Sequence, residues 1–117
     1  MTQRDPGVYL EDIEYCADAA VRYTAGYSLA QYLADDKTRA AVERMLEICG
    51  EALRQLDRAA PDVASRIPYT REIIGFRNIL AHGYAELDHH KVYAIAVIHA
   101  PELLAAVRTT LKEFPEP

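Results

Sequence analysis

Four side chains that can act on a phosphate lie within the eight residues RNILAHGY. They are the guanidinium of Arg77, the amide of Asn78, the imidazole of His82 and the phenol of Tyr84. An arginine can hold a phosphate through two hydrogen bonds and stabilise the charge of a transition state. A histidine exchanges protons near neutral pH, and Asn78 could orient it or bond to the phosphate. These residue types suit cleavage of RNA, whose own 2′-hydroxyl is the nucleophile, so no metal ion is required.

One ideal helix would not aim these groups at a single point. At about 100° per residue, Arg77 and Tyr84 lie within about 20° of each other, whereas His82 lies about 140° from Arg77. A helix that ends at Gly83 would free Tyr84 to fold back, and the long Arg77 side chain could sweep round. Pairing of two copies across a dimer is a further way to bring the groups together. A histidine and a glycine are also ordinary residues at a helix end, so these residues alone leave a purely structural role open.

The motif ends a helix that the apolar spacing predicts over residues 69–82. Gly83 is expected at the left-handed position that follows this helix. A long amphipathic helix is predicted over residues 37–60, and its Glu51 either reaches the site or simply stabilises the fold. Gly50 costs this helix about 1 kcal/mol relative to alanine, so we expect a close helix crossing at that point.

The helix over residues 37–60 is predicted to bury one apolar stripe and to expose its charged residues elsewhere. The expected stripe is Ala41, Met45, Ile48, Cys49, Ala52, Leu53 and Leu56. The charged residues expected to face elsewhere are Glu43, Glu47, Arg54 and Arg58.

The remaining segments also have the helical period, and no alternating run with a partner predicts a sheet. The chain is therefore expected to be all-α, an antiparallel four- to five-helix bundle forming one domain over residues 1–117. Its other expected elements are a helix over 8–25 that ends near Gly26, a kink or short helix over 28–34, an N-cap at Asp35 or Asp36, a loop over 61–68, a helix capped by Asp88, and a segment over 102–114 that Pro101 opens or kinks.

The composition is that of a soluble globular protein, and the net charge of -5 disfavours wrapping a polyanion, so any RNA site must be local. No run of residues approaches the roughly 20 apolar residues of a membrane span or the core of a signal peptide, which predicts a cytoplasmic protein without membrane contact. Cys16 and Cys49 are expected to be buried free thiols. His89 and His90 point to different sides of a helix, so with His82 they make a poor metal site, and both are expected to be solvated polar residues at a helix start. We therefore expect no bound metal.

Five tyrosines lie near the N-terminus, which is more aromatic surface than one small core needs. Packing in the core and in a dimer is the expected use, with base stacking as the alternative. These residues are Tyr9, Tyr15, Tyr23, Tyr27 and Tyr32.

The stretch from Arg77 to Tyr84 resembles the R-x4-H-x-Y motif of HepT toxins, a branch of the HEPN superfamily. The resemblance covers roughly residues 8–113, because ICGEAL with Gly50 and Glu51, the proline-bounded loop before IIGFRN, and ELDHHKVYAI follow one another in the family's order.

The resemblance implies a HEPN-like homodimer that cleaves RNA without a metal ion or other cofactor. Transfer RNA is one candidate substrate. It implies that Arg77 binds phosphate, that His82 is the general acid or base, and that the cleft lies at the dimer interface. It also implies a type VII toxin–antitoxin pair, in which an MntA-like minimal nucleotidyltransferase uses ATP and Mg to transfer AMP to Tyr84. An added phosphate would block the cleft and repel RNA.

Two other functions fit the same residues. A non-catalytic helical dimer could bind nucleotide and a nucleotidyltransferase, with RNILAHGY as the docking surface. A purely structural helical protein would instead bury His82 in its own core. Binding to DNA is not expected.

Overall fold

The computed structural model describes residues 5–83 and 87–115, and all regular structure within these ranges is helical. The predicted all-α class is therefore confirmed. The elements are α1 (Pro6–Thr24), α2 (Leu29–Ala34), α3 (Asp36–Ala59), α4 (Pro61–Ala64), α5 (Thr70–His82), α6 (His89–Ala94), the π-helical turn η2 (Ile95–His99) and α7 (Ala100–Leu111).

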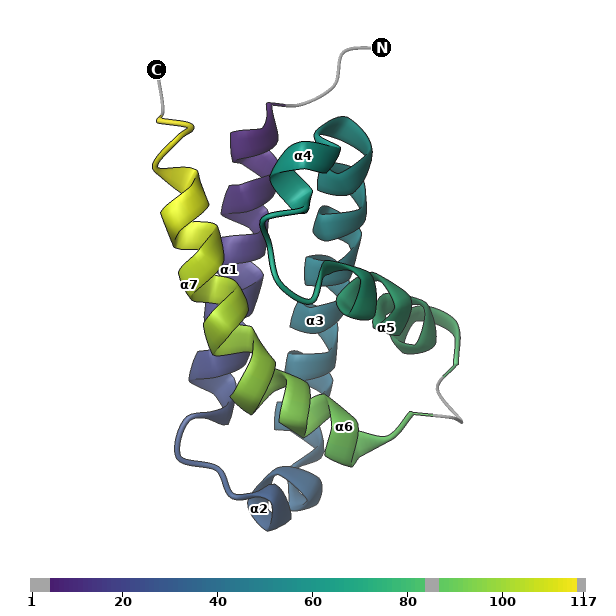
Figure 1. Cartoon of the computed structure of the whole chain (residues 1–117). Helices are drawn as coiled ribbons and strands as arrows, with labels where there is room; N and C mark the ends of the chain where they lie inside the picture. Colours follow the sequence, from purple (N-terminus) through teal and green to yellow (C-terminus); the bar gives the residue numbers. More distant parts are fainter. Residues whose placement is uncertain (1–4, 84–86, 116–117) are drawn as a thin grey trace.

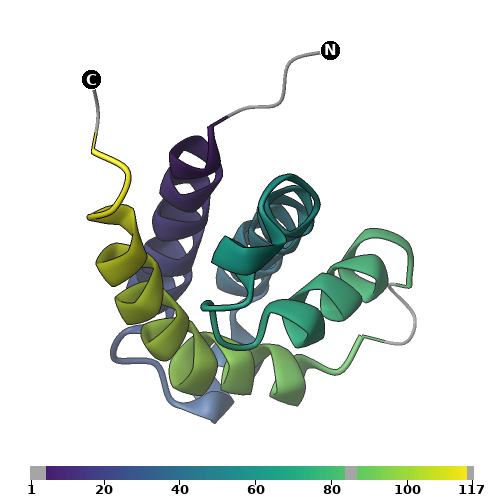
Figure 2. The same cartoon turned by 45° about the horizontal axis from the view of Figure 1, so that its top comes forward.

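Three long helices lie side by side, and a fourth, α5, crosses α3. Helix α1 packs against both α3 and α7 and runs antiparallel to them (Figure 1). Helix α5 packs on α3 but points away from the bundle axis, which both views show (Figure 2). The motif helix is thus held mainly by α3, and its C-terminal end projects to one side of the molecule.

The boundaries of α2 and α3 follow from local capping. Gly26 has a φ of 78°, the left-handed conformation that a glycine adopts at little cost after a helix. Ser28 and Gln31 cap α2 reciprocally, so residues 28–34 form a short helix of their own. Asp35 then accepts a 3.1 Å bond from the backbone N–H of Thr38 and caps α3, as the sequence predicts.

The buried face of α3 differs from the predicted stripe. In the C-terminal half of α3 the prediction is confirmed, because Cys49, Ala52, Leu53 and Leu56 are all buried. In the preceding turns Val42, Glu43 and Leu46 are buried instead, whereas Ala41, Met45 and Ile48 are only half-buried. The prediction that Glu43 faces away from the core is therefore wrong. Helix α3 packs against α1, α5 and α2 together, so its buried arc is wider than one stripe.

Two further predictions at helix ends are wrong. Residues 61–64 form the short helix α4 rather than a loop, because a proline suits the first position of a helix, where no N–H bond is needed. Gly83 is not left-handed: its φ is -117° and its ψ is 44°. Its N–H still donates a 2.8 Å bond to the carbonyl of Ile79, which satisfies the end of α5.

Helices α6, η2 and α7 form one continuous helix over His89–Leu111. It begins at Asp88, whose carboxylate caps it as predicted. Pro101 does not break it, because the wider π turn just before the proline relieves the clash of its ring with the preceding turn.

This continuous helix is longer and more apolar than the separate segments predicted from the sequence. It has 23 residues, and a mean hydropathy of 1.3 over a window of 18 of them, which would suffice to cross a membrane by length and composition only. The expectation that no segment approaches such a span was therefore wrong. One helix of this kind is weak support for a membrane span, because a buried helix in a soluble core has the same composition.

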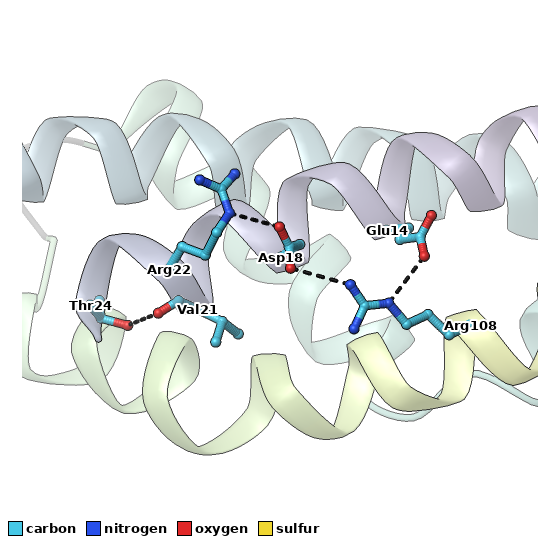
Figure 3. A network of polar contacts seen from close by, with 6 residues as sticks. All are labelled: Glu14, Asp18, Val21, Arg22, Thr24 and Arg108. Carbon is cyan, nitrogen blue, oxygen red and sulfur yellow. Dashed lines mark hydrogen bonds and ion pairs between the residues drawn. The ribbon is translucent and has the colours of Figure 1, made fainter. Parts of the chain in front are cut away.

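The contact between α1 and α7 carries a network of charged side chains (Figure 3). Arg108 of α7 donates to Glu14 at 3.1 Å and to Asp18 at 3.2 Å, and both acceptors lie on α1. Arg22 donates to the other oxygen of Asp18 at 2.7 Å. These bonds hold the pKa of Asp18 below its ordinary range, and the bond from Arg22 has the largest effect.

The two cysteines are buried and free, as predicted. They belong to the larger of two apolar clusters, which α1, α3, α4 and α7 form together. Tyr9 and Tyr32 are buried in the clusters, which confirms core packing for these two tyrosines. Tyr15 has 63% of its surface exposed and packs in neither cluster.

Candidate functional site

The site is built where α5 crosses α3 at Gly50. A Cβ placed on Gly50 would lie 2.5 Å from the Cβ of Arg77 and 3.0 Å from the carbonyl oxygen of Ile73. No real side chain tolerates the shorter distance, so the absence of a side chain at Gly50 allows the two backbones to approach. The close crossing predicted at this glycine is confirmed, and it places Arg77 directly over α3.

Arg77 is held by the residue that follows this glycine. Its Nη2 lies 3.2 Å from Oε2 of Glu51, and its Nη1 donates a 3.3 Å bond to Oδ1 of Asn78. About a quarter of the Arg77 side chain is exposed (26%), so the residue is partly accessible to solvent. Its Nε is buried and makes no hydrogen bond with the described residues.

Glu51 joins Arg77 to two more side chains of α3. Arg54 donates to its Oε1 at 2.6 Å, and Gln55 donates to the same oxygen at 3.4 Å. The pKa of Glu51 lies below its ordinary range, chiefly because Arg54 donates this bond. The positive charges of Arg54 and Arg77 and the bond from Gln55 lower it further. Arg54 was expected to face elsewhere and Gln55 was not predicted to take part, although their spacing of three and four residues from Glu51 is a signal for such contacts.

A polar pocket of about 220 Å³ lies beside Arg77, between α1, α3 and α5. Its lining includes two guanidinium groups, those of Arg44 and Arg77, and three carboxylates, those of Asp12, Glu47 and Glu51. This excess of negative charge opposes a phosphate inside the pocket. A phosphate would therefore have to reach Arg77 from outside this pocket, through the exposed part of its side chain.

His82 lies on another side of the same helix. It is the last residue of α5 and is exposed, and it does not line the pocket beside Arg77. Helical geometry sets it about 140° from Arg77 around α5. One copy of the chain therefore brings Arg77, Asn78 and Glu51 together but leaves His82 apart. Tyr84 lies outside the described residues.

The two histidines after the motif differ from each other. His90 is exposed, as predicted, but His89 is half-buried with its Nδ1 3.5 Å from Oε2 of Glu43. The prediction of two solvated histidines is thus wrong for His89. Burial raises the pKa of Glu43, and the neighbouring His89 and Arg39 partly offset this rise. Within residues 5–83 and 87–115, no three histidine, cysteine or carboxylate side chains gather as a metal site would need.

Comparison with known proteins places the chain in a family. A family model described as ribonuclease HepT-like matches residues 13–110. A protein from Methanocaldococcus jannaschii, provisionally named an RNase, is 30% identical over 88% of this chain and 94% of its own length. A second, from Thermococcus cleftensis and provisionally named ribonuclease HepT, is 35% identical over 68% of this chain and 72% of its own. No solved structure matches the chain.

The family match spans the whole site described above, from the middle of α1 through the crossing at Gly50 to the end of α7. It agrees with the family that the R-x4-H-x-Y pattern indicates. The chain therefore belongs to the HepT-like ribonuclease family.

Proposed function

We propose that this protein is a metal-independent endoribonuclease and the toxin of a type VII toxin–antitoxin pair. The observation that carries the proposal is the arrangement of Arg77 and His82 within a HepT-like chain. Glu51 fixes the guanidinium at a helix crossing, and the imidazole is exposed at the end of the same helix. Relatives that share most of the chain are provisionally named RNases, which supports the same activity.

The proposed reaction is an attack by the 2′-oxygen of RNA on the adjacent phosphorus. A bond forms between that oxygen and phosphorus, the bond to the 5′-oxygen breaks, and the products are a 2′,3′-cyclic phosphate and a 5′-hydroxyl. A neutral His82 accepts the proton of the 2′-hydroxyl, and an imidazolium donates a proton to the leaving oxygen. Arg77 stabilises the negative charge on the phosphate oxygens.

The functional unit of this proposal is a homodimer. Arg77 and His82 lie about 140° apart around one helix, so a single copy does not direct both at one phosphate. Two copies related by a twofold axis supply two of each residue to a shared cleft. The paired imidazoles would then serve as the base and the acid of the reaction.

Regulation by a partner enzyme completes the proposal. A MntA-like minimal nucleotidyltransferase would use ATP and Mg to transfer AMP to the phenol of Tyr84, two residues after His82 in the sequence. The added phosphate carries negative charge beside the cleft and would repel an RNA backbone. We place both proteins in the cytoplasm, where the RNA substrate of the ribonuclease is found.

The first test is RNA cleavage by purified protein in the presence of EDTA. Wild-type protein and His90→Ala, which changes an exposed histidine of α6, are expected to cut RNA. Arg77→Ala and His82→Ala are expected to lose at least about a hundredfold in rate, since both groups act in the transition state. Undiminished cleavage by both alanine variants would refute the assignment, and loss of cleavage in EDTA would refute metal independence.

Mass spectrometry tests the regulation separately. After incubation with the partner enzyme, ATP and Mg, the wild-type chain should gain the mass of one or more AMP units, whereas Tyr84→Phe should gain none. Modification without any RNA cleavage by the unmodified protein would favour the non-catalytic partner role instead.

A further inference from the structure

A second cavity lies on the opposite side of α5 from the crossing with α3. It is a groove of about 480 Å³ between α5 and the segment formed by α6 and η2. Gly75 of α5 opens its floor, because a Cβ added there would meet no atom within 4 Å. Phe76 and Ile79 of α5 and Ile95 of η2 supply apolar walls. Nothing in the proposed reaction accounts for this groove.

Aromatic rings line one end of the groove. The ring of Tyr69 packs against that of His99 with their centroids 4.5 Å apart. The phenol of Tyr69 donates a 2.6 Å bond to Glu102 of α7, and its backbone is left-handed with a φ of 65°. A non-glycine residue holds that conformation only where its surroundings fix it. The Tyr69 ring is therefore a firmly positioned flat surface, of the kind on which a nucleobase stacks.

Basic side chains line the same groove. Arg71 and Lys91 are both exposed, and neither makes an ion pair with the described residues. The Nζ of Lys91 lies 5.9 Å from the centroid of the Phe76 ring, which keeps the ammonium over the groove. Glu72 is the one carboxylate among the lining residues, so the groove has a positive balance in a chain whose net charge is -5.

The groove leads to the proposed catalytic histidine. His82 lies about 20° from Gly75 and about 60° from Ile79 around the helix, so all three share one face of α5. The rise from Ile79 to His82 is about 4.5 Å, less than one helical turn. A chain of nucleotides with its phosphate at His82 would therefore pass directly into the groove.

We propose that this groove binds a nucleotide of the RNA adjacent to the scissile phosphate. The base stacks on the Tyr69 and His99 rings, and a neighbouring phosphate binds Lys91 and Arg71. RNA supplies a flat ring and negative charge together, which matches both features of the groove. A second copy of the chain would match the apolar walls but would bring the same positive balance against itself. This proposal rests on the proposed ribonuclease function and adds a substrate-binding subsite to it.

The test measures binding apart from cleavage. Fluorescence anisotropy with a labelled single-stranded RNA of mixed sequence gives Kd in the His82→Ala background, where cleavage does not interfere. Gly75→Phe fills the groove, and Lys91→Glu reverses one of its charges. Each is expected to raise Kd about tenfold, which is the range that loss of one stacked base or phosphate contact gives. Lys112→Glu changes an exposed lysine outside the groove and is the matched control for charge.

The outcomes separate the groove from the activity. An unchanged Kd in both groove variants, or equal weakening by Lys112→Glu, would overturn the subsite. Sedimentation of Gly75→Phe provides the second readout, because conversion of a dimer to a monomer would assign the groove to a second copy of the chain instead. Failure of the wild-type protein to cut RNA would reject the ribonuclease proposal itself, whatever Kd the groove variants give.

Discussion

Gly50 and Arg77 lie in direct contact across the crossing of α3 and α5, with no room for a side chain on the glycine. An added Cβ would lie 2.5 Å from the Cβ of Arg77. The next residue, Glu51, reaches the guanidinium of the same arginine at 3.2 Å. Two adjacent residues of α3 thus set both the distance of the motif helix and the direction of its arginine.

The first prediction concerns this contact. Gly50→Ala should lower the free energy of unfolding by about 1 to 3 kcal/mol, the usual cost of overpacking, even though alanine favours a helix. The displaced atoms include the backbone carbonyl of Ile73 at 3.0 Å, so α5 itself must shift. Urea denaturation measures the change.

Gly75→Ala is the matched control for that substitution. It makes the same change on α5, where the new Cβ meets nothing within 4 Å. It should raise stability by up to about 1 kcal/mol through helix propensity alone. Equal effects of the two substitutions would contradict the close crossing.

Much of this fold can be predicted from the sequence, because its signals are local. Asp35 and Asp88 mark helix starts because each side chain bonds to backbone N–H groups two or three residues later, and Gly50 marks a crossing because it has no side chain. The orientation of α3 could not be predicted in the same way. Its buried Glu43 depends on packing against several helices and on a histidine 46 positions later in the chain.

In the candidate site, too, local features could be predicted from the sequence and contacts between helices could not. Arg77 and His82 were predicted to lie far apart around one helix, and their surroundings in the structure differ accordingly. The hold of Glu51 on Arg77 was left open by the sequence, because it depends on how closely α5 approaches α3. The groove on the far face of α5 needs residues from two separate segments, 69–79 and 91–99, so no local pattern indicates it.

The second prediction concerns the thiols. Burial raises the pKa of Cys16 to about 11 and also raises that of Cys49, so both are protonated at neutral pH. Because the thiolate is the reactive form, neither should react with Ellman's reagent in the native protein. Unfolding in urea should release two reactive thiols. Rapid reaction of one thiol before unfolding would contradict the burial of that cysteine.

The third prediction concerns the role of Glu51 in the proposed reaction. Glu51→Gln keeps the size of the side chain but removes the charge that holds Arg77, so the guanidinium loses its fixed direction. We expect kcat for RNA cleavage to fall about ten- to a hundredfold, as for other losses of positioning. Glu113→Gln is the control, because it weakens a comparable 2.6 Å ion pair with Arg66 far from the motif in the sequence. An equal fall in both variants would argue against a specific role for Glu51.

The last prediction concerns the stability of the protein at acidic pH. The pKa of Glu51 lies below its ordinary value in the folded protein, chiefly because Arg54 donates to it, so the folded state binds a proton at this carboxylate less readily than the unfolded chain. Its contribution to stability is therefore complete above the unfolded pKa and is lost as the pH falls through the folded pKa. Melting temperature should fall between about pH 6 and about pH 3 in the wild-type protein and less steeply in Glu51→Gln.

The comparison of these two proteins isolates Glu51 from the other carboxylates. Asp18 and Asp35 also have lowered pKa values, and the pKa of the buried Glu43 is raised, which acts in the opposite direction. All three groups are present in both proteins, so their contributions cancel in the difference of the two curves. Parallel curves would mean that Glu51 gains nothing from Arg54 and Arg77 on folding, and its proposed role in positioning Arg77 would then fail as well.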